Sequence, residues 1–369
     1  MGERVEYNKK DSAIMFAIVL VLPMLATSFF ALVLKLIFPS MNQTLNYYLL
    51  LAFNQAMFLT CYLAYNATAK INGVKACNVK FNLNIWQVVI IILIGLVAMY
   101  GFSYLTEYLE YLMRLVGYKA DNFSLLNTSS LPMFFVNIVV VALMPAICEE
   151  FIFRGVILNG LKSTGKVKMI VLSGLMFSIM HLSLQQSVYQ FILGMVLSAI
   201  VMITGSIVSS IILHFFNNFF VLFTNLIVQL IVQPSGEATV FTPSGVMDHI
   251  LPFLIAIVAV VLIYLLLCLL KKCTKQPMYE IFNLKKSKPS KQANINSLST
   301  TQPLAETLPS SDSKVEDASQ DGASQAVQST VESGELSKPK TSTENVFLIA
   351  SLIFGAVLWI INVIGEFIL

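Results

Sequence analysis

The chain has 369 residues, of which 57% are hydrophobic and only 12% are charged, and its formal net charge is +3. This low share of charge excludes an ordinary soluble domain, in which about a quarter of the residues are charged. Apolar runs recur along the chain, and they are long enough to cross the hydrocarbon core of a bilayer. Because backbone polar groups in lipid must be satisfied within their own segment, we predict an all-α, polytopic transmembrane helical bundle.

The apolar runs predict eight or nine spans, the first of which is too long for a signal-peptide core and is expected to be an uncleaved helix. The predicted boundaries are residues 13–38, 46–65, 86–106, 131–160, 167–184, 187–204, 206–232, 247–270 and 346–368. The resulting organisation is a transmembrane domain at 1–270 with a polar-residue-bearing core at about 131–232, a polar linker at 271–344, and a C-terminal transmembrane helix at 345–369.

Lysine and arginine form clusters that predict the orientation of the chain. The clusters lie before the first span (Arg4, Lys9, Lys10), between spans 2 and 3 (Lys70, Lys75, Lys80), between spans 4 and 5 (Lys162, Lys166, Lys168) and after span 8 (Lys271, Lys272, Lys275). With this count of spans all four lie on one side, so the positive-inside rule predicts a cytoplasmic N-terminus. The linker at 271–344 is rich in Ser, Gln, Lys, Thr, Glu and Pro and is expected to be cytoplasmic and disordered.

The fourth predicted span carries charges that are costly in lipid. It contains the stretch CEEFIFRG, with Glu149, Glu150 and Arg154. Glu150 and Arg154 are four residues apart and share a helix face, so we expect them to pair. Glu149 points about 100° away from Glu150 and needs another partner. Pro145, one turn earlier, removes a backbone hydrogen bond and is expected to free a carbonyl near the two acids.

Two further spans carry histidine at a similar depth. His181 lies near the end of the fifth span and His214 inside the seventh, where Asn218 shares its face. Measured from one side of the membrane, Glu149, His181 and His214 lie roughly 16, 22 and 13 Å deep. These positions alone leave open catalysis or metal binding, a proton or ion pathway, and structural pairing. His249 is expected to be an interfacial residue without a special role.

Three short motifs occur in order on these spans: EEFIFR fits EExxxR, FSIMH fits FxxxH, and HFFNN fits HxxxN. Together, over about residues 137–222, they resemble the CPBP intramembrane proteases, which include type II CAAX prenyl endopeptidases and bacterial bacteriocin-immunity or Abi proteins. The resemblance implies an intramembrane endopeptidase of a bacterial cell membrane, with CAAX-type C-terminal processing as one form of its activity. HExxH, GxGD and GxSG motifs of other intramembrane proteases do not occur in the sequence.

The resemblance also implies roles for individual residues. Glu149 is the expected general base, and His181 holds the attacking water with it. His214 and Asn218 are expected to donate hydrogen bonds to the oxyanion of the tetrahedral intermediate. No cofactor is expected. The alternative is a divalent metal such as zinc, which Glu149, His181 and His214 would hold.

Glu150 is grouped with the catalytic positions because its pairing with Arg154 would fix the rotation of the helix, and Phe177 is expected to pack beside the histidine of its motif. The site is expected to open toward the cytoplasmic half. The expected partners are membrane lipid and a hydrophobic or lipidated peptide or protein, with no nucleic acid. Two rival functions stay open: a non-catalytic immunity or scaffold protein that keeps the motifs, and a proton-coupled transporter.

Overall fold

A computed structural model of the chain describes residues 4–118, 130–231, 241–274 and 341–368. Within these residues the α-helices are α1 (Lys9–Ile37), α2 (Gln43–Ala69), α3 (Gly73–Ala76), α4 (Ile85–Leu115), α5 (Leu131–Asn137), α6 (Met144–Glu150), α7 (Leu158–Gly160), α8 (Lys166–Met180), α9 (Leu184–Thr204), α10 (Ile207–Ile231), α11 (Val246–Cys273) and α12 (Thr341–Ile368). Two π-helical segments, η1 (Ile138–Leu143) and η2 (Phe151–Ile157), and the 3₁₀ segment η3 (Leu161–Thr164) continue α5, α6 and α7.

Eight helices in the described part of the chain are long and apolar enough to cross a membrane, as predicted for an all-α, multi-pass membrane protein. One of them is the composite Leu131–Thr164, which α5, η1, α6, η2, α7 and η3 form together. The predicted span at 167–184 is shorter than expected, because α8 ends at Met180 and has 15 residues. Such a helix reaches about 22 Å, less than the roughly 30 Å of a hydrocarbon core.

Helices α8 and α9 form a hairpin whose close packing depends on glycine. A Cβ atom added to Gly194 of α9 would lie 2.9 Å from the Cα atom of Gly174 of α8, closer than real Cβ contacts. The hairpin turn lies between Met180 and Leu184, so it carries His181. Because α9 runs back beside α8, the chain returns to the end of the bundle from which α8 started.

Contacts between loops bring the four predicted basic clusters to one end of the bundle. We call it the basic end and define it by residues 4–10, 70–84, 159–168, 204–207 and 270–274. The contacts are Arg4 N to Lys70 O (2.9 Å), Asn159 Nδ2 to Ala76 O (3.3 Å), Asn78 Nδ2 to Gly205 O, and Gln87 Nε2 to Thr274 Oγ1 (3.0 Å). The side of the membrane that this end faces stays a prediction from the positive-inside rule.

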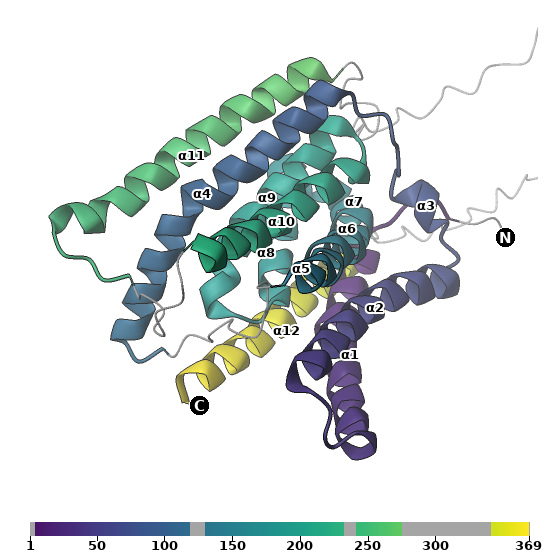
Figure 1. The fold of residues 1–369 in the computed structure, drawn as a ribbon. Helices are drawn as coiled ribbons and strands as arrows, with labels where there is room; N and C mark the ends of the chain where they lie inside the picture. The colour runs from purple at the N-terminus through teal and green to yellow at the C-terminus, as the bar shows by residue number, and fades with distance from the viewer. Residues whose placement is uncertain (1–3, 119–129, 232–240, 275–340, 369) are drawn as a thin grey trace, which may run out of the picture. The chain divides into compact units, whose positions relative to one another are not determined.

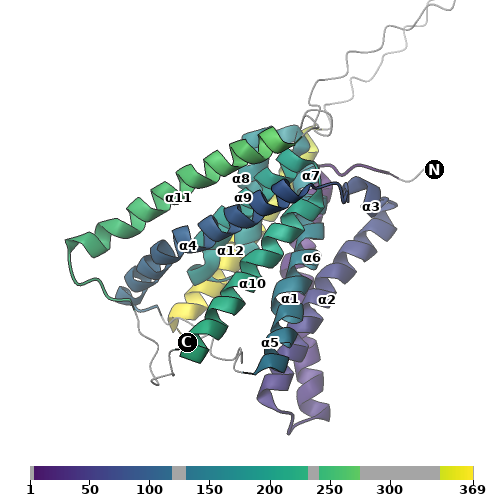
Figure 2. The same cartoon turned by 45° about the horizontal axis from the view of Figure 1, so that its top comes forward.

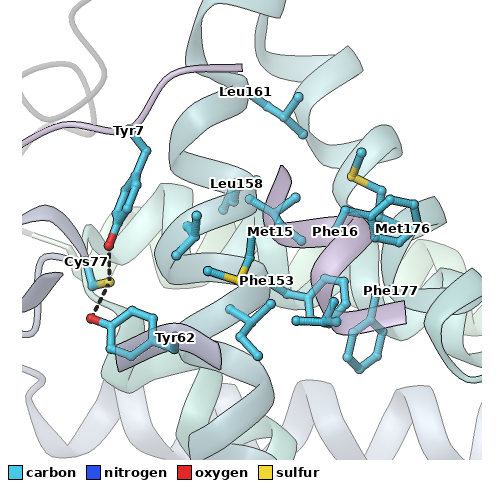
Figure 3. Close-up of a cluster of buried hydrophobic side chains, with 14 of the residues drawn as sticks. Tyr7, Met15, Phe16, Tyr62, Cys77, Phe153, Leu158, Leu161, Met176 and Phe177 are labelled. Atoms are coloured by element: carbon cyan, nitrogen blue, oxygen red, sulfur yellow. Dashed lines mark hydrogen bonds between the residues drawn. The ribbon is translucent and has the colours of Figure 1, made fainter. Parts of the chain in front are cut away.

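The helices that carry the motifs lie between two outer groups. Helices α4 and α11 run side by side at one edge, and α1 and α2 form a hairpin elsewhere in the bundle (Figures 1 and 2). The composite helix contacts α1, α2 and α10, whereas α9 contacts α4 and α11. Figure 3 shows the apolar core between α1, the composite helix and α8, with Phe16, Phe153 and Phe177 among its fully buried side chains. The motif residues therefore face protein rather than lipid.

The C-terminal helix begins earlier than predicted. Helix α11 continues to Cys273 and α12 starts at Thr341, so both ends of the predicted linker at 271–344 are helical. Residues 275–340, on which the rest of that prediction falls, lie outside the described residues. Helix α12 belongs to the same compact unit as α1–α11 and packs against α1 and α8.

Candidate active site

The two adjacent glutamates lie on an irregular part of the composite helix. The π-helical segments η1 and η2 flank α6, and Pro145 occupies the first turn of α6. π-helical turns are rare and occur often at functional sites. Because proline has no N–H, the carbonyl of Val141 lacks its α-helical donor. That carbonyl accepts a hydrogen bond from Asn218 Nδ2 at 3.1 Å, so the predicted free carbonyl is present and binds a motif residue.

Glu150 and Arg154 form the predicted ion pair, and both side chains are completely buried. Arg154 Nη1 lies 2.8 Å from Glu150 Oε1, and its Nη2 donates to the backbone carbonyl of Gly194 at 3.0 Å. The guanidinium lies 4.6 Å from the centre of the Phe177 ring. Glu150 Oε1 also accepts from His214 Nδ1 at 3.0 Å. This pair therefore links the composite helix to α8, α9 and α10.

Glu149 has a different environment from its neighbour. Its side chain is buried, with 5% of the residue exposed, yet it has no cationic partner within ion-pair distance in the described part of the chain. One carboxylate oxygen, Oε1, accepts from Gln55 Nε2 of α2 at 3.1 Å. The other oxygen, Oε2, has no hydrogen-bond partner among the described residues. Glu150 Oε2 also lacks a hydrogen-bond partner among the described residues, so the two glutamates differ in their cationic partner and not in this free oxygen.

Both motif histidines use the same ring nitrogen for a protein contact. His181 Nδ1 lies 2.8 Å from the carbonyl of Phe177, and His214 Nδ1 lies 3.0 Å from the Glu150 carboxylate. Carbonyl and carboxylate oxygens only accept hydrogen bonds, so the Nδ1 atom of each histidine carries the proton. The Nε2 atom of each ring takes part in neither of these two contacts. The ring of Phe177 meets both imidazoles edge to face, at centroid distances of 4.9 and 5.8 Å. Phe177 thus supports both histidines as well as the arginine.

A cavity of about 540 Å³ brings four of the predicted residues together: Glu149, His181, His214 and Asn218 all line it. Glu150, Arg154 and Phe177 do not line this cavity and lie behind it as supports. A second cavity of about 550 Å³ lies along α1 and α2 and has largely apolar walls. Glu149 and His181 line both cavities, so they lie where the two meet.

The cavities extend away from the basic end. The predicted opening toward the cytoplasmic half stays a prediction, because the side of the membrane that this end faces is itself predicted. The first cavity includes Glu107 and Glu110 in the last third of α4, and Gln185 in the first turn of α9. On α10 it reaches Asn225, three turns beyond His214. Each of these positions is farther from the basic end than the motif residues are. The depths estimated from the sequence correctly bring the motif residues together at one cavity. The other residues that line this cavity belong to no motif, so the sequence did not predict their positions.

The structure gives the alternative metal set no geometric support among the described residues, and metal dependence stays a prediction. Among the described residues, no three His, Cys, Asp or Glu side chains lie close enough together to hold a metal ion. Glu149, His181 and His214 line the same cavity without forming such a group. We therefore derive no chemical step through a metal.

Three polar residues at the site were not predicted. Gln55 holds Glu149, as described above, while Tyr189 donates to Asn217 Oδ1, and Asn217 Nδ2 donates to Asn218 Oδ1 at 3.2 Å. All three lie inside apolar helices, where a polar side chain is a signal of function or of helix pairing. That signal was available in the sequence, but it does not say which partner each residue contacts.

Comparison with known proteins agrees with the motifs. Residues 131–220, less than half of the chain, match the family model described as type II CAAX prenyl endopeptidase Rce1-like. Searches of curated proteins and of solved structures found no match to the chain. The matched segment contains every motif residue of the cavity and excludes α1, α2, α4, α11 and α12. The resemblance is therefore confirmed: within a multi-pass membrane protein, residues 131–220 are similar to the family described as type II CAAX prenyl endopeptidase Rce1-like.

Proposed function

We propose that the chain is an intramembrane endopeptidase that hydrolyses a peptide bond of a membrane-associated or hydrophobic peptide. One observation carries the proposal: a buried carboxylate oxygen without a partner, Glu149 Oε2, lines a cavity with two histidines whose Nδ1 atoms are already engaged. Structural ion pairing explains Glu150 and Arg154, but it does not explain an unpaired buried carboxylate, which is costly without a function.

The first chemical step uses water. Glu149 accepts a proton from a water molecule that His181 Nε2 holds through a hydrogen bond, and the oxygen of that water forms a bond to the carbonyl carbon of the peptide. The π electrons of the carbonyl move to its oxygen, which becomes the oxyanion. In the second step the oxyanion re-forms the C=O bond, the C–N bond breaks with its electron pair on nitrogen, and Glu149 returns the proton to that nitrogen. General acid–base catalysis of this kind contributes about 10²–10⁴-fold.

The oxyanion needs donors that are already in position. Asn218 Nδ2 carries two hydrogens; one is given to the Val141 carbonyl and the second is left for the oxyanion. With its Nδ1–H donated to Glu150, His214 donates from Nε2 only when it carries a second proton. The Glu150 carboxylate, 3.0 Å from His214 Nδ1, fixes the orientation of this ring.

The two cavities suggest how a substrate lies. A peptide that passes from the polar cavity beside α4, α9 and α10 into the apolar cavity beside α1 and α2 crosses Glu149 and His181 at their junction. CAAX-type C-terminal processing is the form of this reaction that the family description names. Together with the predicted cytoplasmic basic end, the direction of the cavities favours access from the opposite half of the membrane. We propose a bacterial cell membrane with a cytoplasmic N-terminus as the location, and lipid as a constant partner.

The test is peptide cleavage by the purified full-length protein in detergent, with a library of fluorogenic hydrophobic peptides. We expect Glu149→Gln to lower kcat/KM by about 10²–10⁴-fold, because the general base is removed. His181→Ala should cause a loss of similar size. His249→Asn is the matched histidine control, since His249 lies outside the first cavity and bonds Tyr108 at 3.0 Å.

Thermal stability of each variant separates loss of chemistry from loss of fold. Equal cleavage by wild type and Glu149→Gln would overturn the assignment of the base. A folded wild type that cleaves no peptide would favour the scaffold function instead.

A further inference from the structure

Helix α12 lies outside the family match, yet it contacts the turn that carries His181. Three of its side chains, Trp359, Asn362 and Glu366, are spaced by three and four residues and therefore share one face. That face meets the α8–α9 hairpin turn, although residues 274–340 separate α12 from α11 in sequence.

The hairpin turn has an unusual backbone. Leu182, directly after His181, has a φ of +47°, a left-handed conformation that residues other than glycine rarely adopt. Asn362 Nδ2 donates to the carbonyl of Leu182. Glu366 Oε2 accepts from the backbone N–H of Leu184 at 3.3 Å, and Glu366 Oε1 accepts from Asn362 Nδ2 at 3.3 Å. Contacts from α12 thus hold the backbone on both sides of the turn.

A third contact lies one turn farther along α9. Trp359 Nε1 donates to Ser187 Oγ at 2.9 Å. The carbonyl of Ser187 accepts from Ser178 Oγ of α8 at 2.6 Å, so this contact joins both arms of the hairpin. His181 itself is fixed by Phe177, which lies on the same arm as Ser178. Displacement of the turn would therefore move the imidazole relative to Glu149, which belongs to a different helix.

We propose that α12 is a clamp for the catalytic histidine: Asn362, with Trp359 and Glu366, positions the His181 turn in its strained conformation. These are positioning residues, because they act through the turn and do not line either of the two cavities. The proposal rests on the proposed peptidase function for its effect on rate, but its structural part stands separately. It also gives the last helix a role in the reaction.

The first arm of the test measures kinetics with the full-length chain. Asn362→Leu keeps the size of the side chain and removes its donor, and we expect kcat to fall about tenfold while KM stays within about twofold, as small misplacements of reacting groups affect the chemical step. The matched control is Asn345→Leu at the other end of α12, which loses a hydrogen bond from Lys9 and leaves the turn untouched. If Asn362→Leu fails to fold, Trp359→Phe replaces it, because it keeps a ring and loses only the Nε1–H.

The second arm does not depend on activity. The chain has three histidines, so [¹⁵N]histidine labelling gives few imidazole signals, and His181→Asn identifies the signal of interest. Asn362→Leu should shift the His181 signal and leave that of His249 in place, whereas Asn345→Leu should shift neither. An unmoved His181 signal together with an unchanged kcat would overturn the clamp. If the wild type cleaves no peptide, the proposed function fails, and the NMR arm alone decides: a shifted signal supports the clamp and an unmoved one rejects it.

Discussion

Glu149 and Glu150 are adjacent in sequence, but their carboxylates meet opposite conditions. Glu150 is neutralised by Arg154 and also accepts from His214, so its position is fixed by charge. Glu149 receives one neutral donor, Gln55, at a single oxygen. A neutral donor orients a carboxylate without pairing its charge, whereas the guanidinium of Arg154 pairs the charge of Glu150. The difference between the two acids therefore comes from α2 as much as from the motif.

Removal of this amide should affect catalysis directly. We expect Gln55→Leu to lower kcat about tenfold, because the carboxylate loses the contact that orients it. The control is Thr60→Val on the same helix, since Thr60 bonds the Ala56 carbonyl at 2.8 Å, lines neither of the two cavities and does not bond Glu149. An unchanged kcat would show that Gln55 only packs against Glu149 and does not orient it.

At the scale of the helix, we relate the irregular geometry around α6 to the backbone N–H that Pro145 lacks. Pro145→Ala supplies an N–H that can bond the Val141 carbonyl and compete with Asn218 for it. We expect kcat to fall about tenfold while the unfolding temperature stays the same or rises, because a regular helical bond is gained. Pro132→Ala in the first turn of α5 is the control, since the first N–H groups of a helix have no helical partner. Full activity of Pro145→Ala would show that the activity does not depend on the irregular geometry around Pro145.

The sequence predicted most of the elements because apolar runs and buried charges leave few alternatives in lipid. The pairing of Glu150 with Arg154 and the free carbonyl at Pro145 followed from helical spacing alone. The end of α8 could not be placed exactly, because the turn at residues 181–183 contains no glycine or proline that would mark it. The contact between Gln55 and Glu149 could not be predicted either, since it depends on how α2 packs against α6.

At the scale of the whole molecule, the basic end contains a buried thiol that links stability to pH. Cys77 lies between the hydroxyls of Tyr7, at 3.9 Å, and Tyr62, at 3.3 Å (Figure 3). Burial raises the pKa of the Cys77 thiol from 9.0 to about 11, and burial also raises the pKa of the Tyr7 hydroxyl. The folded protein therefore keeps the thiol proton at pH values where the unfolded chain releases it.

The free energy of unfolding should consequently decrease as the pH rises from about 9 to about 11, by about 3 kcal/mol for a shift of this size. Below pH 9 the thiol is protonated in both states, so no such dependence is expected there. The measurement is chemical unfolding in detergent at a series of alkaline pH values, with Cys77→Ala as the reference. Parallel curves for wild type and Cys77→Ala would contradict the assignment, as would rapid maleimide labelling of Cys77 at pH 8.

The helices that hold the proposed base and the turn of the proposed water-binding histidine lie outside residues 131–220: α2 supplies Gln55 and α12 supplies Asn362. A shortened protein made only of the matched residues would contain all three motifs and still lack the contacts from Gln55 and Asn362. Grafting the motif segment onto a foreign bundle should accordingly yield a fold without useful turnover. Two proteins with identical motifs can therefore differ greatly in kcat, because helices outside the motifs differ.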